Sequence, residues 1–360
     1  MSPRLAQLVS ACIRPDVQAM HAYMVQDSAG LLKLDAMENP FRLPDDLRAA
    51  LGQRLAEVAM NRYPGSRIDD LRAAISKYAP LPEGFGLMLG NGSDELITLL
   101  SVACDVPGAT VLAPVPGFVM YELSAQLQGL NFVGVPLTPN FELDEAAMLA
   151  AIERHQPAII YLAYPNNPTA NLFDDAVVER IIQAAPGFVV MDEAYQPFAS
   201  RSFISQAAHY PNVLIMRTLS KFGLAGVRIG YLMGPKPVIE QLEKVRPPYN
   251  VSVLNAEAAL FALEHQDEYA RQAAVLRSER DKLLAELQTL PGVTPFPSQA
   301  NMILLRVPDA NAVFAGLKAR GVLIKNVSKM HALLHNCLRL TVGTPQENEQ
   351  MMLALKASLV

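Results

Sequence analysis

Short apolar runs alternate with longer amphipathic stretches along most of the chain. Each short run is apolar on consecutive positions, which is typical of strands that are covered on both faces. Such runs predict strands at residues 110–113, 158–163, 188–191 and 213–216. This repeated alternation of strand and helix patterns is typical of an α/β protein.

The stretch between the second and third runs has helical periodicity. Val177, Val178, Ile181 and Ile182 recur at helical spacing, an Asp pair precedes them and Pro-Gly follows. These are signals of a helix start and a helix end. Strand, helix and strand therefore form a β–α–β unit, which implies a parallel sheet.

The pattern changes after about residue 250. A long helical stretch covers 255–288, further helices are expected at 312–321 and 345–359, and strands at 301–307 and 338–343. This second α/β unit is smaller than the first. We therefore expect an irregular N-terminal arm at 1–40, a large domain at 41–250 and a small C-terminal domain at 251–360.

Composition narrows the class of protein. The chain has 360 residues, of which 51% are hydrophobic and 18% charged, so it can bury large cores and is not a disordered protein. A net charge of −5 gives no strong attraction to nucleic acid or to an anionic membrane surface. The apolar runs are far shorter than the ~20 residues of a membrane helix, and the start lacks a secretory signal. We expect a soluble cytoplasmic protein.

Metal and disulfide chemistry is not expected. The three cysteines, Cys12, Cys104 and Cys337, lie far apart without CxxC spacing, and the six histidines show no metal-ligand spacing. Buried free thiols in a reducing cytosol are the simpler interpretation.

Three predicted strands are each followed by a polar group that can do chemistry. Asn167 follows the second strand, Asp192 the third and Lys221 the fourth. Ligands of open α/β sheets bind beyond the carboxyl ends of the strands, so these side chains are expected to converge. A lysine amine forms a Schiff base with an aldehyde, and pyridoxal 5′-phosphate (PLP) uses such a lysine with an acid at its ring nitrogen.

The remaining predicted roles follow from this chemistry. Asp192 keeps the ring nitrogen protonated, Asn167 and Tyr195 hydrogen-bond the 3-oxygen, and Lys221 moves the proton. The glycine-rich turn before residues 96–103 offers free N–H groups and a helix start, with Ser93 as its expected N-cap, to a phosphate. Ser220 and Arg228 could add a hydroxyl and a charged fork to this phosphate site, and Phe118 is placed to stack on the ring.

Each feature alone has a simpler explanation. Lys221 alone fits a surface lysine, Asp192 a helix start, Phe118 a core residue, and the Gly90–Asp94 segment an ordinary strand–helix turn. That turn lacks the third glycine of the dinucleotide fingerprint, which speaks against a nicotinamide enzyme. Together, in this order and at strand ends, the features favour a PLP site.

The ordered motifs YPNNPTA (164–170), MDEAY (191–195), RTLSKFGLAGVRIG (217–230) and CLRLTVGTPQEN (337–348) resemble the fold-type I PLP-dependent aminotransferases. LDAMENP (34–40), NRYPGS (61–66) and GNGSDELI (90–97) are similar to the histidinol-phosphate branch of that family. The resemblance implies a three-layer αβα large domain with a mostly parallel sheet, and a smaller α/β C-terminal domain. It covers nearly the whole chain.

Carried over by position, the resemblance assigns the covalent bond to PLP to Lys221. It also implies that the phosphate is surrounded by Gly92, Ser93, Asp94, Ser220 and Arg228. It implies that Tyr63 reaches the phosphate of the neighbouring subunit, so the active site requires a homodimer. Arg339 is similar to the arginine that binds the α-carboxylate of glutamate, or the phosphate of the other substrate. Tyr23 and Lys325 are expected to assist there.

Three departures from the family pattern stand out. Ala170 replaces the usual glycine. The additional methyl group is tolerated if the backbone at this position has φ < 0. Lys221 and Arg228 are seven residues apart, one fewer than in many relatives. Lys325 stands where arginine is common, and lysine cannot bind a phosphate with a bidentate fork.

The resemblance implies transfer of an amino group from L-histidinol phosphate to 2-oxoglutarate, by a ping-pong mechanism, in histidine biosynthesis. An aromatic amino-acid aminotransferase and a phosphothreonine-type PLP decarboxylase are the alternatives among enzymes. A non-catalytic PLP-binding regulator is disfavoured, because the chain has no room for a fused DNA-binding module.

Overall fold

The computed structural model describes residues 2–22 and 26–359. By its contacts the chain forms two compact units, Met1–Gly30 and Leu31–Val360. The first unit holds helices α1 (Pro3–Cys12) and α2 (Pro15–Ala19), so the expectation of an irregular arm is wrong for this segment. Each helix starts with proline, which suits the first helical turn, and Ser2 caps α1 by accepting a hydrogen bond from the Leu5 amide. Tyr23 lies outside the described residues.

A sheet of seven strands forms the centre of the larger unit, in the order β2-β8-β7-β6-β5-β3-β4. β8 runs antiparallel to both of its neighbours, β2 and β7, and the other neighbouring pairs of this sheet are parallel. The four predicted strands and the parallel β5–α8–β6 unit are confirmed, whereas β2, β4 and β8 were not predicted. The strands are β2 (Phe85–Gly90), β3 (Thr110–Val115), β4 (Asn131–Pro136), β5 (Ile159–Ala163), β6 (Phe188–Asp192), β7 (Val213–Thr218) and β8 (Gly230–Pro235).

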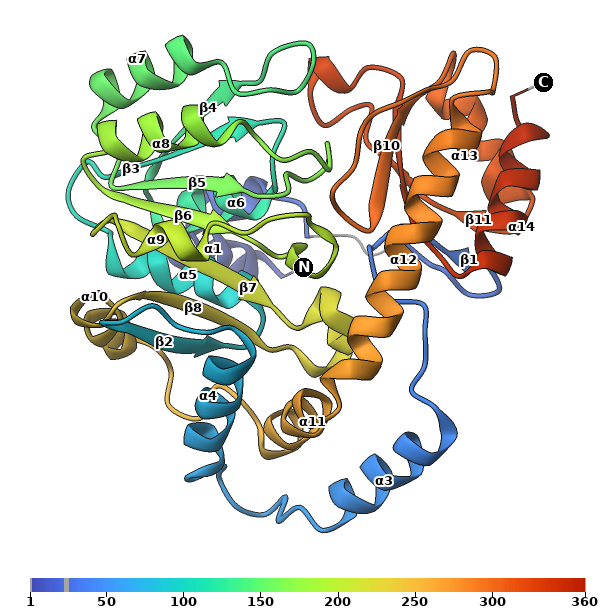
Figure 1. Cartoon of the computed structure of the whole chain (residues 1–360). Helices are drawn as coiled ribbons and strands as arrows, with labels where there is room; N and C mark the ends of the chain where they lie inside the picture. The colour runs from blue at the N-terminus through green and yellow to red at the C-terminus, as the bar shows by residue number, and fades with distance from the viewer. Residues whose placement is uncertain (1, 23–25, 360) are drawn as a thin grey trace. The chain divides into compact units, whose positions relative to one another are not determined.

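Helices cover both faces of this sheet, giving the expected three layers (Figure 1). Within β5, Ile160 and Leu162 join one hydrophobic cluster, whereas Ile159 and Tyr161 join the other, as the alternation of a strand requires. The first cluster includes side chains of α4 (Arg67–Tyr78), α7 (Glu145–His155), α8 (Asp175–Ala184) and α11 (Val253–Glu264). The second includes side chains of α5 (Ser93–Ala103), α6 (Met120–Gln128) and α10 (Lys236–Leu242).

A smaller antiparallel sheet, ordered β12-β13-β10-β9, lies in the C-terminal part of the chain. Its core is a third hydrophobic cluster that includes Leu34 and Met37, and β1 pairs with β11 in parallel. The elements are β1 (Leu32–Lys33), β9 (Thr294–Pro295), β10 (Met302–Arg306), α13 (Ala310–Ala319), β11 (Val322–Leu323), β12 (Lys325–Asn326), β13 (Cys337–Thr341) and α14 (Pro345–Lys356). The predicted strands and helices of this region are therefore confirmed, and the domain boundaries at 40 and 250 stay predictions.

The predicted long helix at 255–288 is two helices. α11 ends at Glu264 and α12 (Gln266–Leu287) begins after His265, whose backbone (φ −110°, ψ 31°) leaves the helical region. No glycine or proline lies at this break, so the sequence gives no local signal for it. The remaining helices and helical turns are α3 (Asp45–Ala56), α9 (Ile204–Ala207), Gln196–Phe198, Ser220–Leu224, Ala225–Val227, Glu243–Val245 and Ala332–Leu334. Within the described ranges, no helix combines the length and the apolar composition that crossing a bilayer needs.

Candidate active site

Lys221 lies in the helical turn Ser220–Leu224, just beyond the end of β7. Its Nζ donates a hydrogen bond of 2.9 Å to the carbonyl oxygen of Ala36. Burial and, next, the nearby Arg339 cation lower the pKa of Lys221 to about 8. A larger share of this amine is therefore neutral near physiological pH than of an exposed lysine, and the neutral form is the nucleophile and the base.

Asp192 is the last residue of β6 and is almost fully buried. Its Oδ2 accepts a hydrogen bond of 2.6 Å from the Tyr121 hydroxyl, and its Oδ1 accepts one of 3.1 Å from the Ala194 amide. Burial raises the pKa of Asp192 to about 6, and both hydrogen bonds oppose this rise. Asp192 is thus a carboxylate held in place by two donors, able to pair with a buried cation.

Tyr121 was not among the site residues predicted from the sequence. It lies in α6, three residues after Phe118, and its ring meets the Phe118 ring edge-on with 5.6 Å between centroids. The spacing from Phe118 is compatible with one helical face, but the pattern of residues gave no reason to connect Tyr121 with Asp192.

Asn167 joins two other predicted residues. Its Nδ2 donates to the Tyr195 hydroxyl at 3.1 Å, and its Oδ1 accepts from Arg339 Nη1 at 2.7 Å. All three side chains are buried, and burial raises the pKa of Tyr195, which stays protonated. The loop after β5, the turn after β6 and strand β13 therefore meet at one point, as the convergence of strand ends predicted.

Arg339 also reaches the N-terminal part of the larger unit. Its Nη2 donates to the Asp35 carbonyl oxygen at 2.7 Å, next to the carbonyl that accepts from Lys221. Lys325 is the direct antiparallel partner of Arg339, so both side chains leave the same face of the small sheet. Two cationic residues are thus neighbours where the sequence predicted substrate anions.

The glycine-rich turn lies at the start of α5. Gly92 is the N-cap with φ 83°, and Ser93 is already the first helical residue, so the prediction of Ser93 as the N-cap is wrong. A Cβ on Gly92 would come within 2.5 Å of the Arg228 guanidinium, whose Nη2 lies 3.4 Å from Asp94 Oδ2. Arg228 therefore reaches this turn in spite of the short seven-residue spacing to Lys221, and its own backbone has φ 55°.

Ser220 and Ala170 complete the strand-end loops. The Ser220 hydroxyl accepts from Thr218 Oγ1 at 3.0 Å and is buried. Ala170 has φ 65°, so the condition stated for easy tolerance of its methyl group, a negative φ, is not met, and its backbone lies in the region that favours glycine. Its amide nevertheless donates to the Asn166 carbonyl at 2.8 Å, which closes the turn. The peptide bonds before Pro165 and Pro168 are cis.

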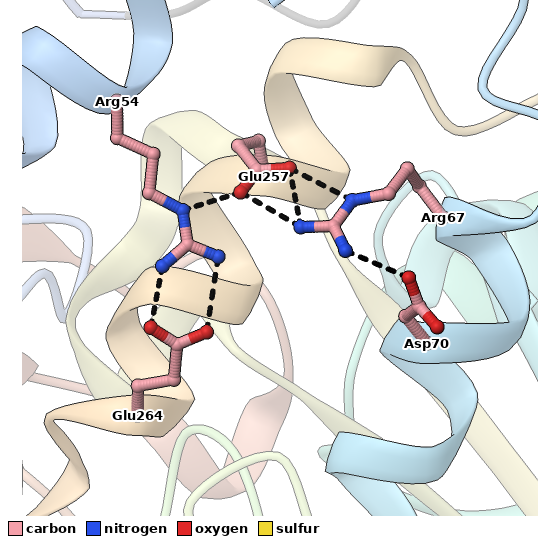
Figure 2. A network of polar contacts seen from close by, with 5 residues as sticks. All are labelled: Arg54, Arg67, Asp70, Glu257 and Glu264. Atoms are coloured by element: carbon pink, nitrogen blue, oxygen red, sulfur yellow. Dashed lines mark hydrogen bonds and ion pairs between the residues drawn. The ribbon is translucent and has the colours of Figure 1, made fainter.

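Tyr63 stacks on Tyr249, with ring centroids 4.1 Å apart, rather than on the other predicted cofactor residues. The two rings are 73% and 56% exposed. The segment that carries Tyr63 is held at both ends by Glu257 of α11, which accepts from Arg54 of α3 and from Arg67 of α4 at 2.7 Å (Figure 2). An exposed aromatic pair is therefore presented on a firmly anchored segment.

The two arginines have further acidic partners in the same network. Arg54 also binds Glu264, and Arg67 also binds Asp70 (Figure 2). Glu257 is the only member of the drawn network that contacts both arginines.

The chain matches the model of the class I and II aminotransferases over residues 29–355. A solved structure of histidinol-phosphate aminotransferase from Sinorhizobium meliloti, in complex with pyridoxal-5′-phosphate, has the same fold: its TM-score is 0.84 at 24% identity, covering 97% of this chain and 98% of that one. The chain belongs to the class I and II aminotransferases.

Its relatives narrow the family. Histidinol-phosphate aminotransferase of Methylibium petroleiphilum is 69% identical over all of this chain and 96% of its own length. That of Polaromonas naphthalenivorans is 64% identical over all of this chain and 98% of its own. Within its class, the chain therefore belongs to the histidinol-phosphate aminotransferases.

Proposed function

We propose that this protein transfers the amino group of L-histidinol phosphate to 2-oxoglutarate, which yields imidazole-acetol phosphate and L-glutamate, with PLP as its cofactor. The observation that carries the proposal is the convergence of a lysine of lowered pKa, a buried carboxylate and a buried arginine on the strand ends. High identity to histidinol-phosphate aminotransferases over the full chain supports both the reaction and its place in histidine biosynthesis. A location in the cytoplasm remains a prediction.

The residues present fit PLP. Gly92 leaves beside Arg228 a space that a single Cβ would fill, and this space lies at the N-terminus of α5, where N–H groups favour an anion. Asp192 supplies the buried acid, and Lys221 the amine. When bound, PLP supplies an aldehyde for amines and a protonated ring that stabilises negative charge at the substrate Cα.

The protein's own residues carry out the remaining steps. Lys221 Nζ would take a proton from the substrate Cα and deliver one to the carbon that carries the aldehyde in PLP, and its lowered pKa suits an amine that must both accept and release a proton. Asp192 holds a proton on the ring nitrogen of the cofactor. Asn167 and Tyr195, already hydrogen-bonded to each other, present donors to the ring oxygen.

Arg339 and Lys325 bind the substrate anion. The guanidinium is buried at the junction with Asn167, and the lysine lies opposite it in the register of the sheet. A carboxylate and a phosphate both accept from such donors, so one subsite serves two unlike substrates in turn.

A homodimer is part of the proposal. Tyr63 and Tyr249 form an exposed aromatic pair, which is a typical feature of a protein interface, and Tyr63 would reach the cofactor phosphate of the partner. Sedimentation velocity measures the oligomeric state directly. A protein that remains a monomer while it binds PLP and turns over would contradict this part.

A half-reaction tests the function. The PLP-loaded protein is mixed with histidinol phosphate alone, and conversion of the bound cofactor to its pyridoxamine form is followed by absorbance. We expect conversion in the wild type. In Lys221→Ala we expect no conversion, and no PLP that becomes permanently attached to the protein on reduction with borohydride. Conversion by phenylalanine alone would instead indicate an aromatic aminotransferase, and release of CO2 from O-phosphothreonine a decarboxylase.

A further inference from the structure

The buried hydroxyl of Tyr121 has no role in the reaction described so far. It donates a hydrogen bond of 2.6 Å to Asp192 Oδ2 from α6, a helix on one face of the sheet, while Asp192 ends a strand within the sheet. The Tyr121 ring is 2% exposed and lies parallel to the Tyr161 ring, with 4.3 Å between centroids and 2° between planes. The hydroxyl is therefore fixed in position by packing on the ring that carries it.

We infer that Tyr121 is a positioning residue that keeps the Asp192 carboxylate ionised and correctly aimed for the ring nitrogen of PLP. The inference rests on the proposed function, because it concerns the affinity of the site for PLP. A hydrogen bond to a charged acceptor favours the charged form and is stronger than one between neutral groups. Each carboxylate oxygen has two lone pairs, so the Tyr121 bond leaves room for a second donor.

The surroundings of Asp192 explain why this donor matters. Acidic groups face it from two elements: Asp94 of α5 and the adjacent Glu193, and both disfavour its ionised form. Glu193 is paired with Arg217 at 2.8 Å, and Asp94 lies 3.4 Å from Arg228.

The other titratable groups near Asp192 are the phenols of Tyr121, Tyr161 and Tyr195, whose pKa values burial raises, so they remain neutral. Of these three phenols, only that of Tyr121 donates to Asp192 in the described part of the chain.

Tyr161 provides a matched control. Its ring is as buried as that of Tyr121 and stacks on it, but among the described residues its hydroxyl has no hydrogen-bond partner. Tyr121→Phe and Tyr161→Phe therefore remove the same group from two adjoining rings. Only the first removes a bond to Asp192.

The experiment measures the dissociation constant of PLP for the wild type and both variants by equilibrium dialysis, from about pH 5 to about pH 8.5, a range that brackets a carboxyl of raised pKa. For Tyr121→Phe we expect roughly tenfold weaker binding at the acid end, since a bond to a charged group is lost. The ratio of the dissociation constant of this variant to that of the wild type should approach one as the pH rises, because Asp192 is then ionised in both proteins. Tyr161→Phe should match the wild type throughout.

A double-mutant cycle shows whether Tyr121 acts through Asp192. In the Asp192→Asn background, Tyr121→Phe should change PLP affinity by less than about twofold. An undiminished effect in this background, a ratio independent of pH, or an equal loss in Tyr161→Phe would each overturn the inference. Failure of the wild type to bind PLP would instead refute the proposed function, so the two failures are distinguishable.

Discussion

Arg339→Lys is the substitution that best tests how one subsite serves two substrates. The guanidinium donates through Nη1 to Asn167 and through Nη2 to the Asp35 carbonyl, both at 2.7 Å. A lysine keeps the charge, but its single nitrogen cannot copy the planar fork that spans two acceptors. The variant therefore loses directional donors while the positive charge remains in the site.

The expected size of the effect follows from the number of bonds lost. One hydrogen bond from a charged group contributes about 1.5–3 kcal/mol, which corresponds to roughly a 10- to 150-fold fall in kcat/KM. The charge itself is retained, so the fall should not exceed this range by much. We propose that the same fork binds both anions in turn, so histidinol phosphate and glutamate should be affected to a similar extent.

The assay follows the two half-reactions separately, each with one amino donor in single turnover, and compares kcat/KM with the wild type. Lys325→Arg is the matched control, because it introduces a guanidinium on the same face of the same sheet, whereas Arg339→Lys removes one. We expect it to keep or raise the value for histidinol phosphate. A fall confined to one donor would refute a shared subsite, and an unchanged Arg339→Lys would refute the role of the fork.

Two further predictions concern the protein itself. The pKa of Lys221 is lowered from 10.5 to about 8, so between these values the unfolded chain binds a proton that the folded chain lacks. The free energy of unfolding of the cofactor-free protein should therefore rise with pH across this window in urea titrations, and Lys221→Met should flatten the rise. Glu257→Gln should lower the free energy of unfolding by about 1–2 kcal/mol, because two arginines lose a shared partner. Glu264→Gln, at an exposed ion pair, should cost under about 1 kcal/mol in the same titration, and an equal cost for both would contradict the anchoring role of Glu257.

Much of the candidate site could be predicted from the sequence, because several of its functional side chains lie at the ends of strands. Asn167, Asp192 and Lys221 each follow a run of consecutive apolar residues, and such runs are read reliably when the strand is buried on both faces. Arg339 was also predicted, through the resemblance of its motif to that of the aminotransferases.

Other features depend on tertiary contacts that leave no local pattern. Tyr121 meets Asp192 only because α6 packs on the sheet, and backbone carbonyls such as those of Asp35 and Ala36 have no side-chain identity to read. The positive φ of Ala170 runs against its own preference and is imposed by the surrounding turn. The break at His265 likewise lacks a glycine or proline.

The junction at Arg339 has a consequence for biosynthesis of the chain on the ribosome. Arg339 connects to Asn167 and Asp35, which lie 172 and 304 residues earlier in the chain. Translation proceeds from the N-terminus, so Asp192 at the end of β6 and Lys221 just beyond β7 emerge well before β13, which carries Arg339. A nascent chain therefore exposes the residues proposed to hold PLP before the strand that supplies Arg339, so the proposed substrate subsite is the last part of the site to be completed.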